Sequence, residues 1–124
     1  MRKILMRCVI LLLILNCSLS FTGCSSKPDI SKEALALTKN AISATDNFLD
    51  GSHDALTAMR LLGSYRDNLD KEVAGNATTL LSIKSSITNI SLAVSLVDDG
   101  SKQKDELIEM RNNLAEKIGV KKYK

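Results

Sequence analysis

A heptad pattern of aliphatic residues near the middle of this 124-residue chain constrains its fold more than any other feature. Its members alternate three and four residues apart: Leu80, Ile83, Ile87, Ile90, Val94 and Val97. This spacing puts them on one side of a helix over residues 77–97, as a seam that must pack against other helices. The sequence Asp98-Asp99-Gly100 predicts the end of that helix, because glycine readily takes the left-handed conformation found at helix ends.

Apolar residues at helical spacing predict three more helices, over residues 30–49, 53–74 and 102–118. The predicted turns are short, so consecutive helices must run antiparallel to one another. We therefore predict an all-α fold, a small up-down bundle of four helices that occupies residues 30–119. The alternative is a bundle of three helices, in which the last two predicted helices merge through Gly100.

Polar residues near the predicted helix starts support these boundaries. Asp29 or Ser31 is expected to cap the first helix, because a side-chain oxygen there can accept a hydrogen bond from a free backbone N–H. Ser52 is expected to cap the second helix, and Ser101 the fourth. Residues 120–124 follow the bundle as a basic tail.

The N-terminal segment has the composition of a secretory leader. Residues 1–7 carry positive charges, and residues 8–15 are an apolar run with the sequence CVILLLIL. Polar residues interrupt the segment after this run, whereas a spanning helix needs about 20 predominantly apolar residues. Residues 1–23 are therefore predicted to be a targeting segment that lies outside the fold.

The sequence Phe21-Thr22-Gly23-Cys24 closes this leader and resembles the lipobox of bacterial lipoproteins. The resemblance implies that Cys24 carries a diacylglyceryl group and becomes the first residue after cleavage, with residues 24–29 as a short tether. It also implies attachment to a membrane of the bacterial cell envelope. That membrane would be the outer membrane in a Gram-negative source, or the outside of the cell membrane in a Gram-positive one.

Charge and cysteine content narrow the function classes. Three of the 17 basic residues lie within the first seven positions, so the remaining chain balances 14 basic against 14 acidic residues. A neutral domain has no general attraction to nucleic acid, and aromatic residues make up only 3% of the chain, which leaves few rings to stack on bases. Cys8 and Cys17 lie in the leader, and Cys24 is the predicted lipid site, so no disulfide or thiolate metal site is expected.

The sequence offers one weak candidate for a metal site, at the first predicted turn. Asp46, Asp50, His53 and Asp54 could supply oxygen and imidazole ligands. The alternative is that the aspartates serve the turn and the next helix start while the histidine is exposed. His53 is the only histidine, and the chain has neither a glycine-rich phosphate loop nor a His-Glu-x-x-His motif, so we expect neither an enzyme nor a cofactor.

The predicted helix over residues 77–97 carries uncharged polar side chains where a solvated helix usually carries Glu and Lys. Lys84 is its only charged residue. Its tentative partner-binding residues are Ser82, Ser85, Ser86 and Asn89. Either this is the most enclosed helix of the bundle, or the polar face docks a protein partner or a second copy of the chain.

These features together predict a membrane-anchored envelope lipoprotein with a small, non-catalytic protein-interaction domain. Two alternatives stay open at the level of sequence. One is a protective lipoprotein of the immunity or exclusion type, and the other is a metal-binding helical domain.

Overall fold

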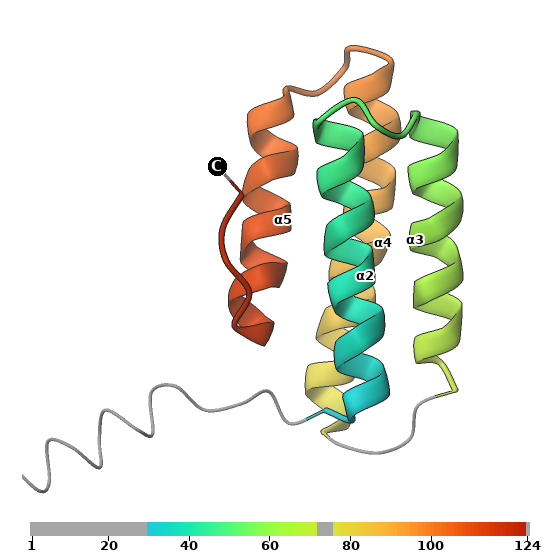
Figure 1. Ribbon diagram of the computed structural model, residues 1–124, viewed down its shortest axis with the longest axis vertical. Coiled ribbons are helices and arrows are strands. Elements are labelled where there is room, and N and C mark those ends of the chain that lie inside the picture. Colours follow the sequence, from blue (N-terminus) through green and yellow to red (C-terminus); the bar gives the residue numbers. More distant parts are fainter. Residues whose placement is uncertain (1–29, 72–75, 124) are drawn as a thin grey trace, which may run out of the picture.

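The computed structural model describes residues 30–71 and 76–123, and these residues form an all-α bundle of four helices (Figure 1). The helices are α2 (Lys32–Leu49), α3 (Ala55–Leu69), α4 (Ala77–Asp98) and α5 (Lys104–Ile118). No strand is present in these two stretches. The predicted leader, Cys24 and the tether all lie outside the described residues.

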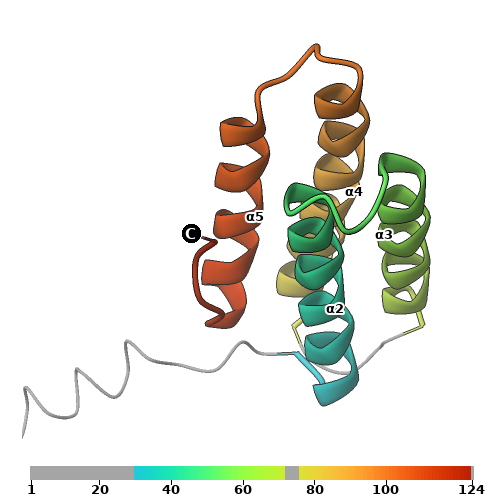
Figure 2. The same cartoon turned by 45° about the horizontal axis from the view of Figure 1, so that its top comes forward.

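The helices run up, down, up and down, as short turns require (Figure 1). Seen with its top turned forward, the bundle has α2 and α4 on opposite sides, with α3 and α5 between them (Figure 2). Both α3 and α5 contact α2 and α4, and α2 also contacts α4 across the bundle. The merged three-helix alternative is wrong, because the chain turns at Gly100, whose φ is 83°, and α5 returns beside α4.

Of the three predicted N-caps, one is confirmed and two are wrong. Ser31 caps α2 as predicted, since its side chain accepts a hydrogen bond from the Ala34 N–H at 3.0 Å. Asp54, and not Ser52, caps α3. The backbone N–H of Ser52 instead donates to the Asn47 carbonyl at 2.8 Å, which makes this serine part of the turn that follows α2.

The last helix also starts later than predicted. Gln103 occupies the N-cap position of α5 and makes no side-chain capping bond. Ser101 belongs to the preceding turn, where its N–H donates to a carboxylate oxygen of Asp99 at 2.8 Å. Likewise, α3 ends at Leu69 and not at residue 74.

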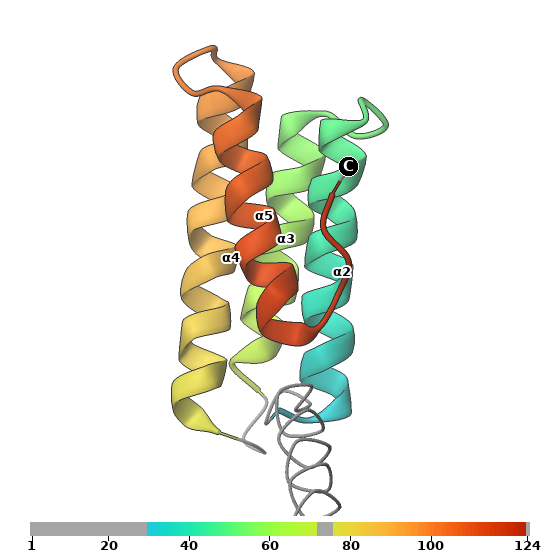
Figure 3. The same cartoon turned by 90° about the vertical axis from the view of Figure 1, so that its left-hand side faces the viewer.

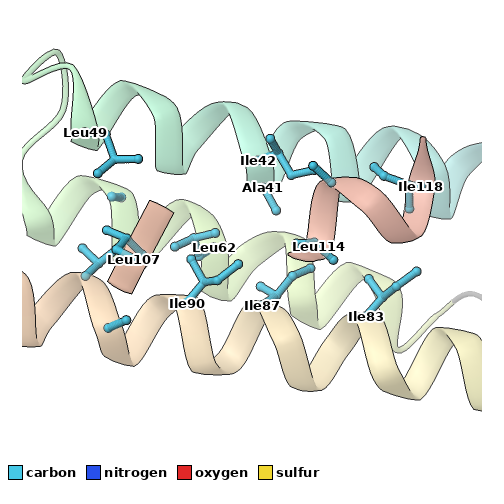
Figure 4. Close-up of a cluster of buried hydrophobic side chains, with 14 of the residues drawn as sticks. Ala41, Ile42, Leu49, Leu62, Ile83, Ile87, Ile90, Leu107, Leu114 and Ile118 are labelled. Atoms are coloured by element: carbon cyan, nitrogen blue, oxygen red, sulfur yellow. The ribbon is translucent and has the colours of Figure 1, made fainter. Parts of the chain in front are cut away.

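The core draws large aliphatic side chains from α3, α4 and α5 and mainly small ones from α2 (Figure 4). The fully buried large side chains include Leu62, Leu69, Ile83, Ile87, Ile90, Leu107 and Leu114. On α2, Thr38 and Thr45 are also fully buried. Their hydroxyls donate to the carbonyls one turn earlier, at 2.7 and 2.9 Å, so neither hydroxyl is left without a partner in the core.

Candidate functional site

The side of α4 that faces away from the core carries a second heptad pattern, which we call the outer stripe. Its members are Thr78, Leu81, Ser85, Thr88, Leu92 and Ser95. Each lies two positions before a residue of the predicted seam, of which Leu80 and Val97 are half-buried and the rest buried. About 100° of rotation per residue therefore puts the stripe on the opposite side of the helix. The first five members are exposed and Ser95 is half-buried.

Two large apolar side chains stand out from this stripe. Leu81 is 65% exposed and Leu92 is 61% exposed, while Leu56 on α3 is the third large hydrophobic residue that the described part of the chain exposes. Viewed from the side of α5, α4 stands at one edge of the bundle, opposite α2 (Figure 3). The outer stripe is therefore an uncharged strip, with two large apolar side chains, that no other described helix covers.

The interpretation of α4 as the most enclosed helix is wrong. Seven of the 18 residues of α2 are buried, against five of the 22 residues of α4. By length and a mean hydropathy of 1.5, α4 is also the one described helix apolar enough to cross a membrane. It nevertheless contacts all three other helices, and Lys84 pairs with Asp70 beside α3, which makes α4 a member of the bundle.

The four predicted partner-binding residues divide into two pairs. Ser85 and Asn89 are exposed, as a docking surface requires. Ser82 and Ser86 instead accept hydrogen bonds from the Lys117 ammonium group of α5, at 2.8 and 2.9 Å. These two serines therefore help hold α5 against α4 and lie at the border of the exposed face.

Two adjoining hollows follow the groove between α4 and α5. Their volumes are about 210 and 160 Å³, and both are lined by Asn89 and Met110. Lys117 lines the first hollow and Lys102 the second. The ammonium group of Lys102 lies 2.9 Å from the Glu106 carboxylate, so part of the positive charge of the groove is already neutralised.

No protein-family model, curated protein or solved structure matches this chain. The position, exposure and charge of its own side chains are therefore the basis for assigning a site. The outer stripe carries two of the three large hydrophobic side chains that the described residues expose, and none of its members is charged.

The four candidate metal ligands do not converge on one point. Asp46 pairs with Arg111, and Asp50 accepts a hydrogen bond from the Tyr123 hydroxyl. Asp54 accepts a hydrogen bond from the Thr57 N–H at 2.7 Å. Within residues 30–71 and 76–123, no group of three or more His, Cys, Asp or Glu residues could hold a metal ion.

Local hydrogen bonds at this turn shift the acidity of one candidate. Hydrogen bonding from the side chain and then the backbone of Thr57 lowers the pKa of Asp54 below its usual 3.8. His53 is half-buried, and its Nδ1 atom has no hydrogen-bond partner among the described residues. Asp54 thus caps the next helix, as the alternative interpretation of this turn predicted. Asp46 and Asp50 instead bind Arg111 and Tyr123 near the C-terminus, and the prediction of an exposed histidine is wrong.

Sequence reasoning missed a polar cluster built by the C-terminal segment 119–123. This segment folds back along α5, where the Tyr123 N–H donates to the Asn112 side chain at 2.7 Å and the Arg111 guanidinium donates to the Lys121 carbonyl. The Arg111 guanidinium also lies 5.9 Å from the centre of the Tyr123 ring. The hydrogen bond to Asp50 is the main cause that raises the pKa of Tyr123 above 10.0.

The same cluster surrounds a hollow of about 260 Å³ lined by Asp46, Asp50, Arg111, Lys122 and Tyr123. Its strongest donors and acceptors already bind one another, so the cluster attaches the C-terminal segment to α2 and α5. A signal for it existed in the sequence. Arg111 falls between Leu107 and Leu114 at spacings of four and three, which places an arginine on the buried side of α5 and requires a carboxylate partner.

Proposed function

We propose that this chain is a membrane-anchored lipoprotein of the bacterial cell envelope whose helical domain is a non-catalytic protein-interaction module. In this proposal the outer stripe of α4 is the recognition face, with Asn89 at its edge. The observation that carries the proposal is the exposure of Leu81 and Leu92 within an uncharged helical surface.

The contrast with α5 supports a special role for this surface. The exposed positions of α5 carry mostly charged residues, among them Lys104, Asp105, Glu109 and Glu116, as is usual for a solvated helix. On α4 the exposed positions before Asp98 carry Ala, Thr, Leu, Ser and Asn. Removing such side chains from water costs little, because no ion has to lose its hydration shell.

Membrane attachment would make a weak interface sufficient. The lipobox resemblance makes Cys24 the anchor, and a tether of six residues reaches about 20 Å when extended. A domain held at a surface meets partners on that surface at a raised effective concentration. A single helix face could therefore support binding that would be weak between free proteins in solution.

Crosslinking in cells, followed by purification of the membrane-extracted protein, tests the recognition face. Ser85→Lys introduces a charge on the outer stripe, and Ser64→Lys introduces the same charge at an exposed serine of α3. We expect a crosslinked protein that is retained in wild type and in Ser64→Lys but lost in Ser85→Lys. Loss of the same crosslink in both variants, or in neither, would contradict a recognition role for α4.

The anchor needs a separate measurement. Cys24→Ser should abolish lipid attachment and stall processing, which a change in mobility and loss of labelling by a fatty-acid probe would report. Normal processing and unchanged membrane retention of Cys24→Ser would overturn the lipoprotein assignment and leave the recognition face as an independent question.

A further inference from the structure

We infer that the outer stripe of α4 binds a second copy of this chain, with the two α4 helices antiparallel about a twofold axis. This inference rests on the proposed recognition role of α4 and names the partner. It follows from the symmetry of the stripe, from the charges at the ends of α4 and from the low cost of removing the stripe from water.

The outer stripe reads the same in both directions. From Thr78 to Ser95 its members are spaced three, four, three, four and three residues apart. An antiparallel match about its midpoint places Leu81 opposite the partner's Leu92. The small hydroxyl residues then oppose one another, Ser85 against the partner's Thr88.

This match has the property that a twofold interface requires. In such an interface, if one residue contacts a second on the partner, the second also contacts the first on the partner. Leu81 and Leu92, which are the two exposed leucines of α4, form such a reciprocal pair. Large side chains meet large ones and small side chains meet small ones, so the two helices can approach evenly along the stripe.

The charges at the ends of α4 favour the antiparallel orientation. No acidic residue lies in the first turn of α4 and no basic residue lies in its last turn, so neither end of the helix dipole is neutralised by charges of its own. Asp98 and Asp99 add exposed negative charge at the end that is already negative. Antiparallel pairing brings this acidic end beside the positive first turn of the partner's α4, whereas parallel pairing would bring two acidic ends together.

The stripe can leave water at little cost. The Thr88 hydroxyl donates to the Lys84 carbonyl at 3.0 Å, so its hydrogen bond is kept when the surface is covered. Lys84, the only charged residue between Ala77 and Val97, is held at Asp70 on the side of α3. Neither group obstructs the approach of a second helix.

The dimer is expected to be weak in solution. One pair of helices buries less than the roughly 1,600 Å² of a standard interface. The start of α4 and the start of α2 lie at the same end of the bundle (Figure 1), so an antiparallel dimer has the two residue-30 ends at opposite ends. Two anchored copies would then lie with α4 along the membrane surface, where anchoring raises their effective concentration.

The oligomeric state of the full chain, extracted in mild detergent, tests this pairing by sedimentation over a range of concentrations. We expect wild type to form a concentration-dependent dimer. Leu81→Lys and Leu92→Glu should each weaken association about tenfold or more, because an unpaired charge replaces a leucine at the interface. An equimolar mixture of the two variants should recover the dimer, since antiparallel pairing places the introduced lysine opposite the introduced glutamate.

Leu56→Glu is the matched control for Leu92→Glu, because it replaces an exposed leucine of α3 with the same charged residue. It should leave the dimer unchanged. Circular dichroism of each variant checks folding, and Leu92→Ala provides a second, uncharged variant that should also weaken the dimer. A wild-type chain that stays monomeric, or that crosslinks only to a different protein, overturns self-pairing while leaving the recognition face intact. If the mixture of Leu81→Lys and Leu92→Glu stays monomeric while wild type dimerises, the antiparallel arrangement is wrong. If wild type dimerises but is not retained at the membrane, self-pairing holds and the lipid anchor is wrong.

Discussion

Arg111 of α5 and Asp46 of α2 form a two-pronged ion pair across 65 positions of sequence. The guanidinium Nε lies 2.7 Å from one carboxylate oxygen, and its Nη2 atom lies 2.8 Å from the other. Arg111 is only 5% exposed. The third nitrogen of the guanidinium, Nη1, donates hydrogen bonds to the Asn112 side chain and the Lys121 carbonyl. This arginine therefore joins α2, α5 and the C-terminal segment.

Removal of the carboxylate should destabilise the fold strongly, because it leaves the buried guanidinium without its counter-ion. We expect Asp46→Ala to lower the free energy of unfolding by about 3 kcal/mol, measured by urea denaturation. Asp105→Ala, at an exposed position of α5, should change it by less than about 0.5 kcal/mol. The double change Asp46→Leu with Arg111→Met should recover part of the loss, and equal effects of Asp46→Ala and Asp105→Ala would contradict the importance of the pair.

This pair marks the limit of what local sequence patterns could predict. The seam of α4 was predictable because its six aliphatic residues repeat at helical spacing, and Ile83, Ile87 and Ile90 are indeed buried. The partner of Arg111 was not predictable in the same way. Its identity depends on the rotation of α2 and α5 about their own axes and on the shift of one helix along the other. No local sequence pattern encodes these two quantities.

The shifted helix starts have a different cause. Ser52 and Asp54 are both good N-cap residues, so propensity alone could not choose between them. The choice is made by the turn after α2, where the N–H groups of Ser52 and His53 both donate to the Asn47 carbonyl.

Likewise, two of the predicted partner-binding residues, Ser82 and Ser86, became part of the α4–α5 contact because Lys117 reaches them from another helix.

The aliphatic core should respond to truncation according to burial. Leu62 on α3 is fully buried, and we expect Leu62→Ala to cost about 2–5 kcal/mol through lost burial and a residual cavity. Leu56→Ala makes the same chemical change at a position that is 77% exposed on the same helix. It should cost less than about 0.5 kcal/mol in a denaturant titration. Similar losses for the two variants would show that α3 does not pack as described.

Two glycines should respond in opposite directions to the same substitution. Gly119 ends α5 with a φ of 72°, and Gly63 lies within α3; an added Cβ would have no atom within 4 Å at either position. Gly119→Ala should therefore destabilise by about 1–2 kcal/mol through backbone strain alone. Gly63→Ala should stabilise by about 0.5–1 kcal/mol, because alanine loses less conformational freedom in a helix. Thermal melts of both variants check the sign, and a loss in Gly63→Ala would contradict its helical position.

The N-cap of α3 should make part of the stability depend on acid pH. Because hydrogen bonding from Thr57 lowers the pKa of Asp54 in the folded state below 3.8, the charged carboxylate stabilises the fold. This contribution is complete above the unfolded pKa and is lost as the pH falls through the folded pKa. Asp54→Ala should therefore melt at a lower temperature than wild type at neutral pH, and the difference should narrow in strong acid.

Asp54→Asn keeps a capping oxygen that does not titrate, so it should retain α3 at both pH values. A difference between wild type and Asp54→Ala that stays constant with pH would show that the charge of Asp54 contributes nothing to the cap.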